Sequence, residues 1–393
     1  MEWKHYKMDE LIEEISMGPF GSDVKKEFYV DNGVPILNGS NLQGFKLKED
    51  SFGYLTKEKA DSLKKCNAHR GDIIVTHRGT LGQIVYVPVN SKYDRYVISQ
   101  SQFRFRCKAD LVDVQYLVYY FHTREGQYKI LANASQVGVP ALARATSTFR
   151  LIDIKLPPLD DQRRIASILS SLDRKIELNN KINADLEEMA QAIFKNWFVD
   201  FEPFKDGKFV DSELGMIPEG WKVGRLGELC NFKRGKNLLT KNAIDEGVPV
   251  VAGGLEPSCY HNVANTGAPV ITVSGSGANA GFMRMYHVPV WASDCSFIDI
   301  SCENFYFVYC FLKVNSKLLK HAQTGAVQPH VKPSDIHDFE LVIPDKESIY
   351  DFQDKVKPFF DRIASLQKES SRLSLLRLSL LPRLMSGELE VPE

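Results

Sequence analysis

Residues 270–281, VITVSGSGANAG, carry the glycine spacing of a dinucleotide-binding turn. In such a site a strand leads into G-x-G-x-x-G/A, and a helix begins directly after the glycines so that its N-terminus faces a pyrophosphate. Gly275, Gly277 and Ala280 have this spacing, but the residues that follow, FMRMYHVPVW, are typical of a strand. We therefore expect a turn beside a ligand-facing loop rather than a cofactor site.

The sequence contains no other pattern typical of a catalytic centre. P-loop, H-E-x-x-H and G-x-S-x-G motifs are absent, as is the Asn-Pro-Pro-aromatic motif of amino-methylating DNA methyltransferases. Pro344-Asp345 could begin a nuclease motif, but no acidic-x-Lys follows at a sensible spacing. The nine histidines have no metal-ligand spacing, and the seven cysteines include no C-x-x-C pair. We predict a chain that is not an enzyme and holds no metal or cofactor.

The elements that must position any binding residues occur twice. WKHYKMDELIEEI at residues 3–15 is similar to WKVGRLGELCNF at 221–232, and GVPILNG at 33–39 is similar to GVPVVAG at 247–253. LVYYF at 117–121 likewise matches FVYCF at 307–311. The offset between the copies falls from 218 to 190 residues, which predicts a second copy shortened by loop deletions.

Each copy begins with a globular segment of short strands separated by glycine and proline. DIIVTH, QIVYVPV and SQFRFRC in the first copy, and VPVVAG, APVITV, FMRMYHVPVW and SFIDI in the second, have β-branched and aromatic residues. One short helix follows in each copy. These patterns predict an α+β fold with a mixed or mostly antiparallel sheet and no regular βαβ alternation.

Each globular segment is followed by a long helix with an apolar stripe. The first stripe has Ile165, Leu169, Leu172, Ile176, Ile182, Leu186, Met189, Ile193 and Trp197; the second has Phe352, Val356, Phe359, Ile363, Leu366, Leu373, Leu380 and Leu384. Such spacing is typical of a coiled coil, with Asn179, Asn183, Ser370 and Arg377 as polar insertions that fix the register. We expect two antiparallel helices of about 55 Å each at ~1.5 Å per residue. Pro358 predicts a kink or the start of the second helix. The alternative is that each stripe belongs to a core helix of an ordinary domain.

Charge and hydropathy narrow the possible partners. Residues 1–157 hold 22 Lys and Arg against 18 Asp and Glu, whereas residues 158–215 hold 8 against 12. The first globular segment is thus mildly basic and the first helix acidic, which a solvated surface could equally explain. No apolar run approaches the ~18 residues of a membrane span, and the N-terminus lacks an apolar signal segment. We expect a cytoplasmic protein with no membrane partner.

Several stretches resemble the specificity subunits of type I restriction-modification systems. LPPLDDQRRIASILSSLDRKIELNNKINADLEEMAQAIFKNWFVDFEP at 156–203 looks like their central helical region, and LLPRLMSGELEV at 380–391 resembles their C-terminal one. EGWKVGRLGEL at 219–229 is similar to the opening of their target-recognition domains, and GDIIVTHRGTLGQIVYV at 71–87 to a strand pair within them. The resemblance implies target-recognition domains at 1–157 and 216–344, separated by helical regions at 158–215 and 345–393.

The same resemblance implies a non-catalytic adaptor that binds double-stranded DNA. Each recognition domain would read one half of a bipartite asymmetric site, and the helices would set the spacing and hold two methyltransferase subunits. S-adenosylmethionine, ATP and Mg are expected on partner subunits, to which two restriction subunits can add. The alternatives are a methyltransferase or fused restriction enzyme acting alone, and a DNA-binding or scaffold protein with no methyltransferase partner.

Base reading requires side chains with paired donors and acceptors on loops where the backbone can approach the groove. Arg78 and Gln102 are our candidates for bases in the first domain. The remaining candidates on its loops are Lys25, Lys26, Asn38, Asn41, Thr80 and Arg144. In the second domain the candidates are Arg234, Lys236, Ser276, Asn279 and Lys332. Of these, Lys25, Lys26, Arg144 and Lys332 are expected on phosphates.

Overall fold

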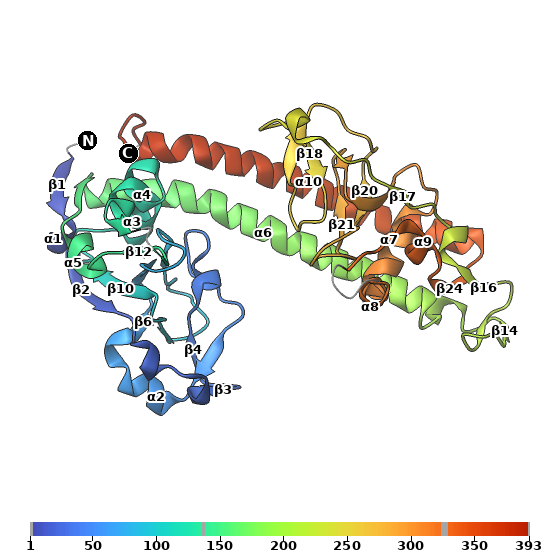
Figure 1. The fold of residues 1–393 in the computed structure, drawn as a ribbon, viewed down its shortest axis with the longest axis horizontal. Coiled ribbons are helices and arrows are strands. Elements are labelled where there is room, and N and C mark those ends of the chain that lie inside the picture. The colour runs from blue at the N-terminus through green and yellow to red at the C-terminus, as the bar shows by residue number, and fades with distance from the viewer. Residues whose placement is uncertain (1–2, 136–137, 324–328, 392–393) are drawn as a thin grey trace. The chain divides into compact units, whose positions relative to one another are not determined.

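The computed structural model describes residues 3–135, 138–323 and 329–391. The chain forms two compact units, one of Met1–Glu177 with Ser370–Glu393 and the other of Leu178–Glu369. Each unit contains one globular module and one end of each of two 40-residue helices, α6 (Leu159–Phe198) and α10 (Lys346–Met385) (Figure 1). The predicted α+β fold with two modules and two long helices is confirmed.

The first module is built on a four-stranded antiparallel sheet in the order β2-β10-β7-β8. These strands are β2 (Ile12–Met17), β10 (Gln102–Cys107), β7 (Ile73–Thr76) and β8 (Ile84–Tyr86). A second, mixed sheet has the order β3-β5-β4-β9-β6. Its strands are β3 (Tyr29–Val30), β5 (Gly53–Leu55), β4 (Val34–Ile36), β9 (Arg95–Val97) and β6 (Asn67–His69).

Two-stranded pairs and short helices complete this module. The pairs are β1 (Lys4–Lys7) with β13 (Asp153–Leu156) and β11 (Ala134–Ser135) with β12 (Ala141–Leu142). The helices are α1 (Met8–Leu11), α2 (Lys57–Ser62), α3 (Val114–Phe121), α4 (Arg124–Leu131) and α5 (Ala145–Arg150).

The second module repeats this plan with fewer strands. Its four-stranded antiparallel sheet has the order β17-β23-β20-β21, from β17 (Lys233–Arg234), β23 (Cys295–Asp299), β20 (Val270–Ser274) and β21 (Met283–Tyr286). Its second sheet has the order β19-β18-β22, from β19 (Cys259–His261), β18 (Val248–Val251) and β22 (Trp291–Ala292). The remaining elements are β14 (Phe209–Val210), β15 (Ile217–Pro218), β16 (Lys222–Arg225), β24 (Glu340–Ile343), α7 (Phe305–Val314), α8 (Ser316–His321) and α9 (Pro333–His337).

The shortening of the second copy occurs mainly in its second sheet. β4 pairs in parallel with β9 in the first module, just as β18 pairs in parallel with β22 in the second. Strands β3 and β6, at the two edges of the five-stranded sheet, have no counterpart in the three-stranded sheet. The four-stranded sheets keep the same strand order, so the framework of each module is preserved.

Charged side chains as well as apolar ones fix the central strand of the first sheet. Phe103 and Phe105 of β10 are fully buried in the main core. Arg104 points to the other face, where it is also buried and contacts Asp72 at 3.2 Å and Glu14 at 2.6 Å. A buried guanidinium is tolerated only where carboxylates compensate it, so these ion pairs hold β10 against its neighbours.

The core of each unit includes both long helices. In the first unit, Ile165 and Leu169 of α6 and Leu384 of α10 pack into one cluster with α3 and the sheet. In the second unit, Phe194 of α6 and Phe352 of α10 pack with α7 in the same way. Burying a side chain of this size contributes about 1.5–3 kcal/mol, so the helices form an integral part of each unit.

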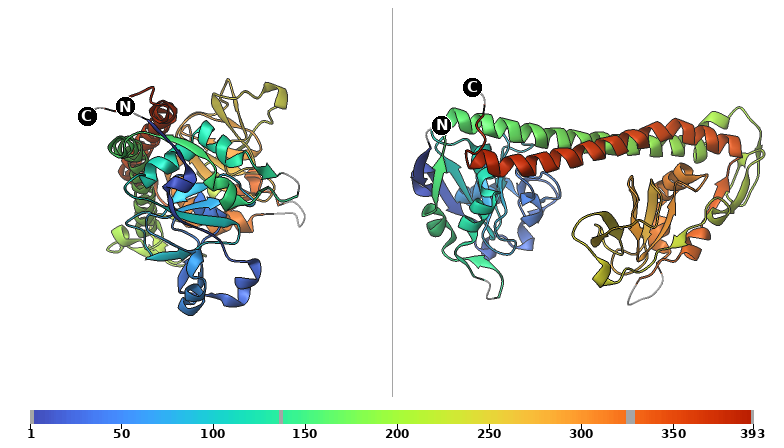
Figure 2. Two further views of the ribbon diagram at one scale, coloured as in Figure 1. Left: turned by 90° about the vertical axis from the view of Figure 1, so that its left-hand side faces the viewer. Right: turned by 90° about the horizontal axis from the view of Figure 1, so that it is seen from above.

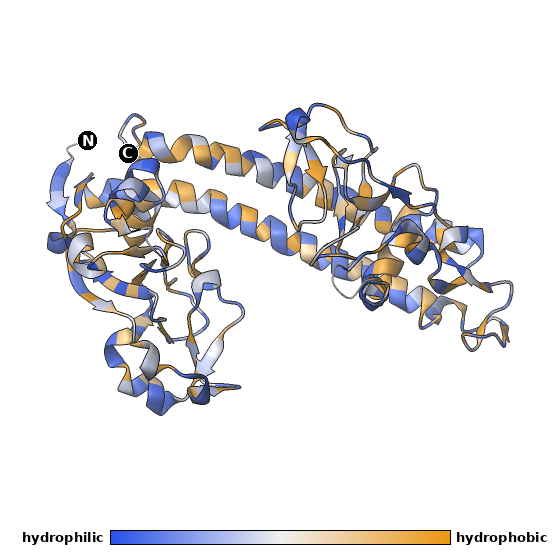
Figure 3. Ribbon diagram, in the orientation of Figure 1, coloured by the Kyte–Doolittle hydropathy of each residue, from blue (hydrophilic) through white to orange (hydrophobic). Residues whose placement is uncertain are grey.

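Within each unit α6 and α10 lie side by side and run in opposite directions (Figure 2). Apolar residues alternate with polar ones along both helices (Figure 3). Two polar insertions form the expected interhelical contacts, since Asn179 donates to Glu369 at 2.8 Å and Arg377 pairs with Asp173. Among the described residues, none of the helices is long and apolar enough to cross a membrane.

Part of the predicted stripe is displaced by one residue. Met189 is half exposed, whereas the buried residues are Ala190, Phe194 and Phe198. On α10 the more deeply buried residue is Phe360 rather than Phe359. The stripe predicted from a 3.5-residue period serves only a helix–helix seam, but these helices also cover the modules and so bury a wider face.

Of the two expectations for Pro358, a kink or the start of the helix, the second is wrong, because α10 starts at Lys346 and continues through the proline. Pro358 and Asp354, whose carbonyl lacks its usual helical donor, are both exposed. Water can therefore satisfy that carbonyl, which lowers the cost of an interior proline.

Candidate nucleic-acid interface

In the first module, several candidate loops meet at one end of the four-stranded sheet. The turn between β7 and β8 is held to the segment leading into α5 by two backbone bonds, from Gly79 N to Pro140 O at 2.9 Å and from Leu142 N to His77 O at 2.8 Å. These bonds flank Arg78, which forms an antiparallel bridge with Ala141. The structure thus brings the 76–80 and 141–147 loops together.

The second module has the same backbone arrangement. Gly277 N donates to Pro329 O at 3.1 Å and Val331 N donates to Gly275 O at 3.1 Å, on either side of an antiparallel bridge between Ser276 and His330. The backbone of residues 77–79 therefore matches that of residues 275–277 in structure. β20 ends at Ser274 and the next element is strand β21, so the expected absence of a helix after these glycines is confirmed.

Glycine is required at the centre of both turns. Gly79 has φ +88° and Gly277 has φ +80°, in the left-handed region that other residues rarely adopt, and a Cβ at either position would meet open space. These glycines therefore set the direction of the chain while leaving room for a ligand beside the turn.

Most candidates in the first module are exposed, namely Lys25, Lys26, Asn38, Arg78, Thr80 and Arg144. Lys25 makes a long contact with Glu27, at 3.8 Å. Arg144 has φ +48°, and this left-handed conformation turns the chain into α5. Asn38 caps a short turn by accepting from Ser40 N at 2.8 Å, so its amide has a structural role even though it is accessible.

Asn41 and Gln102 occupy interior positions, which corrects the expectation that they face DNA. Asn41 is fully buried, accepts from Asn38 N at 2.9 Å and donates to the carbonyls of Lys48 and Asp50. Gln102 is also buried, accepts from Ser99 N at 2.9 Å and donates to Asn38 O at 3.3 Å. Both amides therefore stabilise the loops around the sheet end rather than present donors outside it.

The candidates of the second module divide into two sets. Arg234 and Ser276 lie at the sheet end and both contact Asp294, which the sequence analysis did not single out. Asn279 is half-buried and donates to Gly253 O at 3.3 Å. Lys236 and Lys332 are exposed, the latter at the start of α9.

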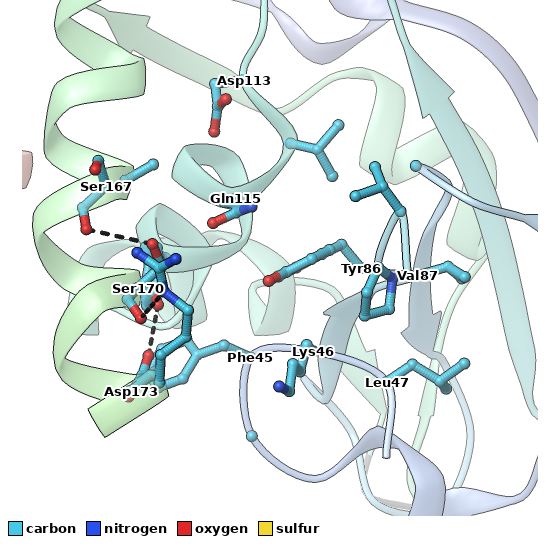
Figure 4. A pocket seen from close by; sticks show the side chains of 18 of the residues that line it. Phe45, Lys46, Leu47, Tyr86, Val87, Asp113, Gln115, Ser167, Ser170 and Asp173 are labelled. Atoms are coloured by element: carbon cyan, nitrogen blue, oxygen red, sulfur yellow. Dashed lines mark hydrogen bonds between the residues drawn. The ribbon is translucent and has the colours of Figure 1, made fainter. Parts of the chain in front are cut away.

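A separate groove of about 1300 Å³ lies in the first unit, between α6 and the module. Ser167, Ser170 and Asp173 of α6 face Tyr86 and the Phe45–Leu47 segment across it (Figure 4). Tyr86 pairs with Ile73, at the end of β7 away from the 76–82 turn. Asp173 is held by Arg377 and by the Tyr119 hydroxyl at 2.5 Å, and burial raises the pKa of Tyr86 to about 12. Neither histidine nor cysteine lines this groove among the described residues.

Four buried cysteines have pKa values raised by burial. Burial raises the pKa of the Cys107 and Cys295 thiols to about 12, and raises the pKa of Cys230 and Cys310 as well. Such thiols stay protonated and act as small apolar side chains. The residues that the structure describes include no group of three or more His, Cys, Asp or Glu that could hold a metal ion.

The comparisons with known proteins agree on one class. A family model described as the type I restriction modification DNA specificity domain matches residues 1–188 and 218–371. The MjaIX specificity subunit of Methanocaldococcus jannaschii, a type I restriction enzyme subunit, is 29% identical over 420 residues that cover 100% of this chain and 94% of the relative. The HindI specificity subunit of Haemophilus influenzae is 24% identical, with coverages of 99% and 100%.

The fold is shared with a solved member of the same class. The crystal structure of the type I restriction-modification S subunit from M. genitalium aligns with a TM-score of 0.59 and 19% identity, over 98% of this chain and 96% of that one. The chain belongs to the family of type I restriction-modification specificity subunits, and its two modules are target-recognition domains.

Proposed function

We propose that this chain is the non-catalytic DNA-reading subunit of a type I methyltransferase complex, with one half of a bipartite asymmetric site read by each module. The observation that supports this proposal is the backbone arrangement at one end of the four-stranded sheet, which occurs in both modules. The same backbone bonds hold residues 77–79 and 275–277, but the side chains at the centre are Arg78 in one module and Ser276 in the other. A constant backbone with different side chains suits two readers of different sequences.

The chemistry of the loops supports DNA as the ligand. Phosphate contacts need exposed cations, and Lys25, Lys26 and Arg144 in the first module are exposed. Lys236 and Lys332 are exposed in the second module. A bidentate contact to guanine needs a fork of donors, which Arg78 and Arg234 can supply. The exposed side chains of each module thus include groups suited to both kinds of contact.

The long helices are proposed to set the half-site spacing and to bind two methyltransferase subunits. On α10, the apolar side chains of Leu375, Leu376 and Leu378 are exposed to solvent. A cluster of exposed apolar residues is typical of a protein-binding surface. S-adenosylmethionine, ATP and Mg are proposed to bind the partner subunits, and the free cysteines fit a reducing cytoplasm.

The test is to express the chain with and without its methyltransferase subunit in a host that lacks adenine methylation. Single-molecule sequencing should then show methylation at a motif of two short specified halves separated by unspecified bases, only when both proteins are present. The purified complex should contain two methyltransferase subunits for each copy of this chain. A chain that directs no sequence-specific methylation and binds no methyltransferase would instead be a stand-alone DNA-binding or scaffold protein.

A further inference from the structure

Arg234, Asp294 and Ser276 form a connected polar cluster at the sheet end of the second module. Arg234 Nη2 donates to Asp294 Oδ1, and the Ser276 hydroxyl donates to Asp294 Oδ2. Asp294 therefore has both carboxylate oxygens engaged by neighbours. The Arg234 side chain is 46% exposed, so the guanidinium is held in place on one side and remains accessible on the other.

The backbone under this guanidinium has no room for a side chain. A Cβ atom built on Gly275 would lie only 2.9 Å from Arg234 Cζ and would overlap Nη1. Gly275 does not have a positive φ, so glycine is needed here for space rather than for backbone conformation. In addition, Gly275 N donates to Asp294 O at 3.0 Å, which ties the turn to the residue that holds the arginine.

The first module lacks this cluster at the corresponding positions. Gly18 N donates to Gln102 O at 2.8 Å, and Gly235 N donates to Cys295 O at 2.8 Å. With these bonds as the reference, Met17 corresponds to Arg234 and Ser101 corresponds to Asp294. His77 corresponds to Gly275, so the first module has a side chain at the position where the second has none beneath the guanidinium. The arginine and the glycine beneath it thus occur together in one module and are both absent from the other.

We propose that Arg234 reads a guanine in the half-site of the second module and that Asp294 is a positioning residue that orients its guanidinium. Arginine donates two parallel N–H bonds to guanine O6 and N7, and this pairing requires a guanidinium held in a defined plane. Asp294 occupies one part of the five-donor fork and leaves the other donors for a base. This inference rests on the proposed function, since it names the base that this sheet end recognises.

The experiment uses the full chain with its methyltransferase subunit and reads methylated sites by single-molecule sequencing. Arg234→Ala should reduce the preference for guanine at one position of one half-site by about 10- to 100-fold, the range expected for loss of a bidentate contact. The other half-site should remain as in the unmodified protein. Arg234→Lys, which keeps the charge but not the fork, should restore the preference only in part.

Variants of Asp294 and Gly275 test whether Asp294 positions the Arg234 guanidinium. Asp294→Ala should lower the same guanine preference, and the double variant Arg234→Ala with Asp294→Ala should lose no more than Arg234→Ala alone. Gly275→Ala should have a similar effect to Asp294→Ala, because the added methyl group displaces the guanidinium. The matched control is Arg225→Ala, which removes the exposed 2.7 Å ion pair with Asp338 on the same module and should change neither half-site.

The possible outcomes separate this inference from the proposed function. A methylated half-site that contains no G·C pair, or an Arg234→Ala variant with unchanged preference at every base, would overturn the inference and leave the proposed function intact. Equal loss at both half-sites in Arg234→Ala would also overturn it, because a folding defect would explain the result. If the unmodified complex methylates no bipartite site, the proposed function itself fails.

Discussion

The two target-recognition modules use one sheet plan but are held to the long helices by different polar contacts. In the first unit, Asp173 of α6 accepts from the Tyr119 hydroxyl and pairs with Arg377 of α10, so one carboxylate joins three elements. In the second unit, Glu187 of α6 accepts from Tyr309 at 2.5 Å and pairs with Lys313 of α7 at 3.4 Å.

Tyr119 and Tyr309 occupy the same place in the repeated motif, so the difference lies in the cation that accompanies the carboxylate. In the second unit an aromatic contact takes the place of a charge on α10, because Tyr309 lies edge-on to Phe360 at 5.3 Å. The attachment of a module can therefore diverge while its framework is retained. The first unit is expected to depend more on a single carboxylate.

Removing that carboxylate should have the largest effect. Asp173→Ala leaves the Arg377 guanidinium and the Tyr119 hydroxyl without their acceptor, and Arg377 Nε is already buried without a hydrogen bond among the described residues. We expect a loss of about 3 kcal/mol in the stability of the first unit, measured by chemical unfolding with hydrogen exchange in α3. Asp160→Ala, which breaks an exposed pair with Arg163 on the same helix, is the control and should change stability by less than about 0.5 kcal/mol. Equal effects of the two variants would contradict the comparison.

The next largest effect is expected on the recognition of bases rather than on stability. Arg78→Ala should relax only the half-site of the first module, by about 2 kcal/mol of base discrimination, because Arg78 is exposed at the centre of the reading turn. Sequencing of methylated sites would measure this, with the exposed Arg124 of α4 changed to alanine as a control. Loss at both half-sites would mean that the assignment of residues 1–157 to one reader is wrong.

A smaller effect on stability is expected when the hydroxyl of Tyr309 is removed. Burial raises the pKa of Tyr309 well above its usual range, so its hydroxyl is a donor to Glu187 at neutral pH. Tyr309→Phe removes this bond but leaves Glu187 with Lys313, so the second unit should lose about 1 kcal/mol. Unfolding of this variant should be compared with that of Tyr128→Phe, which alters a side chain that is 76% exposed. If both phenylalanine variants unfold alike, the hydroxyl of Tyr309 contributes nothing.

The smallest effect is a difference in pH dependence. Burial lowers the pKa of His122, which contacts Ile84 O at 2.9 Å, whereas the corresponding residue of the second module is Leu312. A histidine with a lowered folded pKa contributes stability above its unfolded pKa of ~6.5, and this contribution is lost as the pH falls below that value and through the lower pKa of the folded state. His122→Leu should therefore weaken the fall in first-unit stability between pH 7.5 and 5.5. His77, whose pKa burial also lowers, should retain part of the dependence. An unchanged pH dependence in the His122 variant would count against the assignment.

The repeated framework could be predicted from sequence because it depends on local patterns. The turns at 76–82 and 275–281 contain glycines with positive φ, a conformation that other residues rarely adopt. The two long helices contain apolar stripes that recur over 40 residues. The one-residue displacement at Phe194 and Phe360 could not be predicted, because a helical period alone does not tell which of two surfaces a helix must cover.

The side chains at the reading ends were harder to predict. Asn41 and Gln102 have the amides that read adenine, yet the same groups bond equally well to backbone in their own loops. Asp294 is 60 residues from Arg234, and only the pairing of β17 with β23 brings the two together. The amides are therefore engaged by backbone groups close in sequence, whereas the carboxylate is placed by a contact that is distant in sequence.

The division of the chain also has a consequence for which part can fold without the rest. The second unit is one continuous segment, Leu178–Glu369, whereas the first needs Ser370–Glu393 to complete its core with Leu381, Leu384, Met385 and Val391. We therefore expect a chain shortened to end at residue 369 to keep a protease-resistant second unit while its first unit becomes protease-sensitive. Limited proteolysis of the shortened chain, compared with the full chain, would show whether this is so.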